Sequence, residues 1–128
     1  MRASIDVRED HLLIELHGID QVAAMRRTLL VPFSTIEGAA CEAPAWPRLG
    51  SVRMGTHVPG RIAAGAFKEG AGRRFVDIGR DTRQTLRLTL HNHPEFDEVE
   101  VATDEPERIV GEVARHRPES VQRPPVYE

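Results

Sequence analysis

The sequence predicts a small, mainly β protein of one domain: a barrel or bent antiparallel sandwich of about seven strands, capped by a C-terminal α-helix. Three observations lead to this fold class. The 128 residues, 40% of them hydrophobic, are enough for one core but not for two. Short segments in which apolar and polar residues alternate follow one another along most of the chain. An amphipathic segment with helix start and stop signals comes after them.

The N-terminal segments 4–7 and 11–17 predict a β-hairpin, because apolar residues occupy alternate positions on both sides of the polar turn Arg8-Glu9-Asp10. A short helix is expected after the second strand. Asp20 is placed to be its N-cap, and the spacing of Val22 and Met25 puts both on one helical face.

The middle of the chain predicts one extended segment, one long loop and a second hairpin. Residues 29–40 look extended, with a bulge between residues 32 and 35 and a proline that favours a sheet edge. Residues 43–60 form the longest irregular stretch and end in Pro59-Gly60, a type II turn pair. The segments 61–67 and 73–78 pair around a Gly-rich loop.

The clearest strand is 85–90, which we expect to pair with 97–102. Antiparallel pairing that places Leu88 opposite Val99 also sets Arg87 against Glu100 on the solvent face. Such a cross-strand pair contributes roughly 0.2 to 1 kcal/mol.

The chain is predicted to end in one helix and a tail. Asp104 is the expected N-cap, with Glu107 three residues later, and Pro118 stops the helix. The domain therefore spans residues 1–117, and residues 118–128 form a flexible, Pro-containing tail. The apolar stripe that must bury against the sheet consists of Ile109, Val110, Val113 and Ala114.

Besides the order of these elements, six local motifs are informative: residues 11–16, 20–27, 31–36, 55–60, 65–67 and 104–117. Together they resemble bacterial pleckstrin-homology-like (PH-like) domains. The resemblance implies a fold that hosts many functions. Phosphoinositide-binding members use several Lys and Arg residues in the first hairpin loop, and here that loop, residues 8–10, is net acidic, which disfavours such binding. Some bacterial members assemble into rings, so self-association is an expected function.

Charge is unevenly distributed along the chain, whose net charge is −3. Residues 46–92 hold 9 basic and 3 acidic side chains, whereas residues 93–128 hold 4 basic and 10 acidic ones. This asymmetry suits either an anionic partner or pairing within the protein, and neighbouring strands favour pairing. The single cysteine, Cys41, indicates a reducing compartment, and neither a signal peptide nor a membrane span is recognisable, so a cytoplasmic location is expected.

No set of catalytic residues is recognisable. The sequence lacks a nucleophile elbow, Cys41 has no activating neighbours, and the Gly-rich segment 65–72 lacks the Lys-Ser or Lys-Thr of a phosphate loop. We therefore expect a binding or assembly module without a cofactor or enzymatic activity, whose partner is a protein or a second copy. Its candidate interaction loop contains Trp46, Arg48, Arg53, Thr56, His57 and Arg61.

Two alternatives belong to other functional classes. His91, His93 and Asp97 are residue types that bind transition metals, which would suit a metal-binding protein or a metal-dependent hydrolase. The Arg-rich middle could instead bind anionic lipid or nucleic acid, although the absence of interleaved aromatic residues disfavours nucleic acid.

Overall fold

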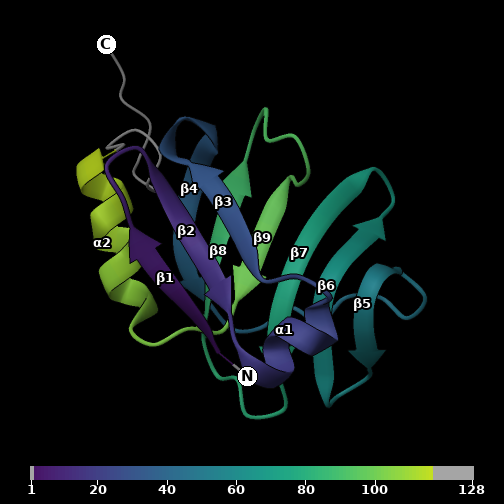
Figure 1. The fold of residues 1–128 in the computed structure, drawn as a ribbon. Helices are drawn as coiled ribbons and strands as arrows, with labels where there is room; N and C mark the ends of the chain where they lie inside the picture. Colours follow the sequence, from purple (N-terminus) through teal and green to yellow (C-terminus); the bar gives the residue numbers. More distant parts are fainter. Residues whose placement is uncertain (1, 117–128) are drawn as a thin grey trace.

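The computed structural model describes residues 2–116, and in this part of the chain nine strands and two α-helices form the fold (Figure 1). In chain order the elements are β1 (Ala3–Val7), β2 (His11–Leu16), α1 (Gly18–Ala24), β3 (Thr28–Pro32), the 3-10 helix η1 (Phe33–Thr35), β4 (Ile36–Glu42), β5 (Val52–Val58), β6 (Ile62–Glu69), β7 (Gly72–Gly79), β8 (Thr85–Leu90), β9 (Glu98–Val101) and α2 (Pro106–His116).

The strands form two sheets. One has the order β1-β2-β3 and the other the order β4-β8-β9-β7-β6-β5. They do not close into a barrel, so the barrel prediction is wrong. The prediction of a mainly β protein with a short helix after the second strand and a helix at the C-terminal end is confirmed.

The described residues hold nine strands where the sequence predicted about seven, because two segments each contain one strand more than expected. Residues 29–40 hold two strands, β3 and β4, and η1 between them leads the chain from one sheet to the other in place of the expected bulge. The position of Pro32 on an edge strand is confirmed. The predicted loop 43–60 contains β5, which lies at the edge of the six-stranded sheet and has no regular burial pattern.

Two glycines allow β5 to pair with β6. Gly55 (φ +137°) lies opposite Gly65 (φ +127°), and a Cβ atom on Gly55 would lie 2.0 Å from the carbonyl oxygen of Ala64. Only glycine fits both the backbone conformation and this close approach. The pairing of this strand with β6 therefore depends on backbone geometry at the two glycines.

The predicted hairpins and turn are confirmed. β1 pairs with β2, and β6 pairs with β7 across the two residues Gly70 and Ala71. At the end of β5 the Arg61 N–H donates to the Val58 carbonyl at 2.9 Å, and Gly60 has the positive φ of +77° that a type II turn requires.

The main core lies between the two sheets and is closed by α2. Apolar side chains from β2, β3, β8 and β9 meet Phe75 of β7 there, and Ile109 and Val113 of α2 are fully buried against them. The stripe predicted for the terminal helix is therefore confirmed. Arg117, Pro118 and the predicted tail 118–128 lie outside the described residues.

The helix α1 differs from its prediction. It begins at Gly18 with His17 as its N-cap, so Asp20 is not the cap but lies in the first turn, buried. Its buried residues are Asp20, Ala23 and Ala24, whereas Val22 and Met25 are exposed. The small alanine side chains let the helix lie close to the sheet, and the larger apolar side chains point to solvent.

The register of β8 with β9 agrees with the prediction, but the environment does not. Leu88 pairs with Val99 and Arg87 pairs with Glu100. Glu100 is nevertheless fully buried, because residues 43–51 cover the outer face of this sheet, so its prediction as a solvent-facing residue is wrong. β9 also pairs in parallel with β7, which makes it a central strand. Among residues 2–116, no helix has the length and apolarity needed to span a membrane.

Candidate binding surface

The six residues predicted as an interaction loop lie on or beside β5 and have different environments. Trp46 is half-buried and packs on the outer face of the six-stranded sheet. The apolar residues beneath it are Ala63, Phe67, Val76 and Ile78, with Val52 beside it. Trp46 therefore fixes its segment to the sheet, which is the alternative to an exposed contact anchor.

Thr56 and His57 also make intramolecular contacts. The Thr56 hydroxyl donates to the Ala23 carbonyl oxygen at 2.8 Å and so joins β5 to α1. The His57 ring meets the Phe67 ring edge-on, with 5.6 Å between centroids. Both residues help to hold this edge of the sheet in place.

The three arginines of the candidate loop are exposed. The Arg48 side chain lies 4.0 Å from Glu69, and Arg53 donates only to the backbone carbonyls of Gly50 and Val52. Arg61 is exposed in the β5–β6 turn, and no ion pair within residues 2–116 includes it or Arg53. Arg53 and Arg61 are thus available to a partner.

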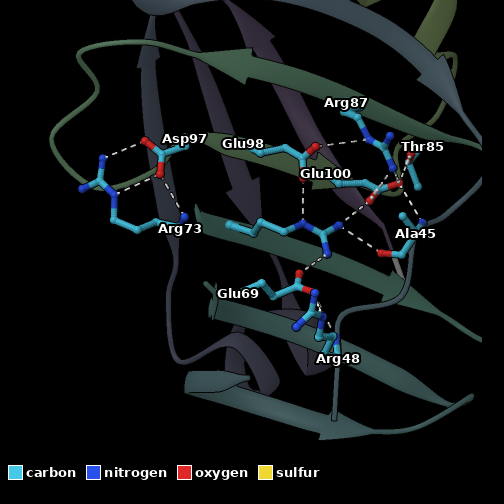
Figure 2. A network of polar contacts seen from close by, with 10 residues as sticks. Ala45, Arg48, Glu69, Arg73, Thr85, Arg87, Asp97, Glu98 and Glu100 are labelled. Atoms are coloured by element: carbon cyan, nitrogen blue, oxygen red, sulfur yellow. Dashed lines mark hydrogen bonds and ion pairs between the residues drawn. The ribbon is translucent and has the colours of Figure 1, made fainter. Parts of the chain in front are cut away.

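A network of charged side chains lies beneath residues 43–51, and its centre is the buried Glu100 (Figure 2). The Glu100 carboxylate accepts hydrogen bonds from Thr85 at 2.7 Å, from Arg74 at 2.7 Å and from Arg87 at 3.2 Å. The backbone N–H of Ala45 also donates to it, at 3.2 Å. Each carboxylate oxygen is therefore satisfied inside the protein.

Arg74 connects this carboxylate to two others. It donates to Glu69 at 2.8 Å and forms an ion pair with Glu98 at 2.7 Å. Burial alone would lower the pKa of Arg74, but the hydrogen bond to Glu69 and the charges of Glu98 and Glu100 outweigh it and raise that pKa. Arg74 stays charged and neutralises the carboxylates around it.

The expectation that the basic middle pairs with the acidic end is confirmed at three arginines. Arg73 pairs with Asp97, and both Arg74 and Arg87 pair with Glu98 and Glu100. These arginines are on β7 and β8, beside the acidic segment that includes β9. Part of the charge asymmetry is therefore used inside the fold.

A second buried group brings two carboxyl groups together without a cation from residues 2–116. The carboxyl groups of Asp20 on α1 and Asp77 on β7 interact, and both residues are buried. Burial, followed by the hydrogen bond and charge of Asp20, raises the pKa of Asp77 to about 8. No Lys, Arg or His side chain of residues 2–116 forms an ion pair with either carboxyl group. Two close buried carboxyl groups without a neighbouring cation among the described residues favour the protonated, uncharged form of Asp77.

The residues of the metal hypothesis have separate partners. His93 is buried, and its Nδ1 accepts hydrogen bonds from the backbone N–H groups of Glu95 and Phe96, while its Nε2 lies 3.1 Å from the Leu30 carbonyl oxygen. Asp97 binds Arg73 as described above. His91 lies 3.7 Å from Glu37. Within the described chain, no three His, Cys, Asp or Glu side chains are grouped to hold a metal ion.

Exposed apolar side chains gather at α1 and β5, which contact each other. Val22 is 73% exposed and Met54 is 56% exposed. We call this group the α1–β5 surface, and it consists of Ile19, Val22, Met25, Met54 and Val58. The sequence analysis placed Met54 and Val58 in a predicted loop, 43–60, and expected Val22 and Met25 to share one helical face. It did not predict that these residues lie on one surface.

Comparisons of the chain with protein-family models, curated proteins and solved structures found no match.

Proposed function

We propose that the protein is a non-catalytic binding or assembly module of the PH-like type, which binds a protein partner or a second copy of itself. The order of the elements supports the PH-like assignment, since strands in two sheets precede a single helix that closes the core. The binding role is supported by surface chemistry and not by any recognised relative.

The observation that supports this proposal most strongly is the α1–β5 surface. Of the seven large apolar residues that are strongly exposed within residues 2–116, five belong to it. The others are Leu30 and Leu49. Large exposed apolar side chains grouped on neighbouring elements are typical of protein interaction sites. Here the patch borders an edge strand, whose outer backbone groups are open to a further strand.

The two alternatives have less support. A metal site at His91, His93 and Asp97 would require breaking the hydrogen bonds of His93 and the ion pair of Asp97. An anionic lipid or nucleic-acid site would need a continuous basic face, but Arg73, Arg74 and Arg87 are paired with carboxylates.

Site-specific photo-crosslinking tests the proposal. A photoreactive amino acid replaces Val22, and a matched variant places it at Thr89, an exposed residue of β8 outside the α1–β5 surface. In the cells that produce the protein, we expect a protein adduct from position 22 and none from position 89. Sedimentation of the purified protein shows whether copies associate, which separates an adduct between two copies from an adduct with another protein. Absence of an adduct at position 22, together with a monomer at all concentrations, would exclude the proposal.

A further inference from the structure

We infer that the α1–β5 surface binds an extended, acidic segment of another protein, which adds as a strand to β5 and places an apolar side chain between Met25 and Met54. This inference rests on the proposed binding function and specifies the chemistry of the partner. It is drawn from the free edge of β5, from a hollow beside that edge and from the charges around it.

The edge of β5 can accept a strand. β5 is hydrogen-bonded to β6 on one side, and no strand of residues 2–116 pairs with its other side (Figure 1). It is the edge strand of the six-stranded sheet on the side away from α2, as Figure 1 shows. A peptide in extended conformation can hydrogen-bond to such an edge through its main chain.

A small hollow lies beside this edge, between the end of α1 and the inner face of β5 and β6. It measures about 60 Å³. Its lining is mostly apolar and consists of Ala24, Met25, Arg26, Met54, Ala66 and Phe75. Two of these residues are exposed methionines, whose flexible side chains adapt to an incoming apolar group. The hollow therefore suits one apolar side chain of a bound strand.

Three exposed basic residues around β5 lack acidic partners within the described chain. Arg53 lies at a register shift near the start of β5, and Arg61 follows its end. Lys68 lies on β6, on the same sheet face as Met54, since Met54 pairs with Ala66. All three are exposed, and none forms an ion pair within residues 2–116. Cations at both ends of the edge favour an acidic strand.

The same charges disfavour a second copy in this position. Antiparallel pairing of two β5 strands would bring the Arg53 end of one copy to the Arg61 end of the other, and like charges there repel. Nucleic acid is disfavoured because the α1–β5 surface has no exposed aromatic side chain on which a base could stack.

Selection from a displayed library of random nine-residue peptides tests the inference directly. We expect the wild-type protein to enrich net-acidic peptides with apolar residues at alternate positions. The variant Arg53→Glu/Lys68→Glu should bind the best peptide at least tenfold more weakly in fluorescence anisotropy. The matched control Arg108→Glu changes an exposed arginine of α2 and should bind it as the wild type does.

Main-chain pairing is tested with the same peptide. N-methylation at alternate residues removes hydrogen-bond donors, and methylation of the set that faces β5 should abolish binding while methylation of the other set leaves it intact. Circular dichroism confirms that the charge-reversal variant is folded. Enrichment of basic peptides, no enrichment, or equal tolerance of both methylated sets would overturn the inference.

The outcomes separate this inference from the proposed function. A protein adduct at position 22 with no selected acidic peptide would retain a binding module and reject the acidic strand. Self-association that Met54→Asp abolishes would identify a second copy as the partner. Binding only to vesicles of anionic phospholipid, or only to single-stranded oligonucleotides, would identify another ligand class. Either result overturns the inference.

Discussion

The two faces of β7 bury charged groups in opposite ways. On the outer face, Arg74 lies among Glu69, Glu98 and the buried Glu100, so each of these carboxylates has a cation beside it. On the inner face, three residues later, Asp77 meets another carboxyl group, that of Asp20. A buried charge needs either an opposite charge or a proton that removes it. The first arrangement lets these groups stay charged inside the fold at neutral pH, and the second makes stability depend on pH.

The largest effect is expected for Glu100→Gln. The substitution keeps the shape of the side chain but removes the charge that Arg74 and Arg87 share, which leaves two poorly solvated guanidinium groups with less compensation. Breaking a buried pair in this way costs about 3 to 5 kcal/mol. Urea denaturation of the wild type and variant measures this loss. Glu9→Gln, in the exposed first hairpin turn, is the control and should change the free energy of unfolding by less than about 0.5 kcal/mol.

If Glu100→Gln and the wild type were equally stable, water would have to reach the charged side chains around Glu100 even though residues 43–51 cover them. In that case residues 43–51 would have to open readily, and Trp46 would not hold them on the sheet.

The next effect has the opposite sign. Asp77→Asn should stabilise the protein at pH 7 by about 3 kcal/mol, because the amide needs no proton and can donate to the Asp20 carboxylate. The folded-state pKa of Asp77 is about 8, above the unfolded value of about 3.9. Between these values the folded state holds a proton that the unfolded state has lost. The free energy of unfolding therefore falls as pH rises, by up to about 1.4 kcal/mol per pH unit.

Urea denaturation from pH 4 to pH 9 checks this prediction. The difference between Asp77→Asn and the wild type should be smallest near pH 4, grow up to about pH 8 and then stay constant. Asp81→Asn, an exposed residue after β7, should leave the slope unchanged. Parallel pH profiles for Asp77→Asn and the wild type would rule out a protonated Asp77.

A third substitution measures one hydrogen bond of the network. Thr85→Val replaces the buried hydroxyl that donates to Glu100 at 2.7 Å with a methyl group of similar size. Hydrogen bonds to charged groups contribute about 1.5 to 3 kcal/mol, and the remaining donors to Glu100 should keep the loss near the lower value. Thr89→Val, on the same strand but exposed, is the control. In the Glu100→Gln background the effect of Thr85→Val should shrink, and strict additivity would argue against coupling.

The sequence predicted only the part of this contrast that depends on local pattern. The pairing of Arg87 with Glu100 followed from alternation in β8 and β9, which is a local signal. The burial of Glu100 did not, because it arises from residues 43–51, which are about fifty positions away. The consecutive apolar residues Phe75 and Val76 point to opposite faces of β7, and both are buried. Such a pair is typical of a strand that is covered on both faces, so it could have indicated that charged residues of β7 are buried too.

The helix and the edge strand were harder to predict for a related reason. α1 is seven residues long, and its buried face consists of Asp20 and two alanines, so the larger apolar residues gave no guide to which face is covered. β5 depends on the contact of Gly55 with Gly65, which lies on a second strand. Val52, Met54 and Val58 do alternate in its sequence, but the prolines and glycines around them favoured a loop. The α1–β5 surface therefore became visible only when both elements were placed.

The smallest effect is expected where a charge pair is exposed to water. Asp97 accepts hydrogen bonds from the backbone and guanidinium of Arg73, and these lower its pKa, but the two side chains are 48% and 41% exposed. Asp97→Asn should therefore cost no more than about 1 kcal/mol at pH 7. Because the folded-state pKa is lowered, this stability is present above pH 4 and is lost as pH falls through the folded value. The loss should shrink in 1 M NaCl, whereas that of Glu100→Gln should not, since salt screens exposed charges much more than buried ones. Equal salt dependence for the two variants in urea denaturation would mean that residues 43–51 do not shield the network from water.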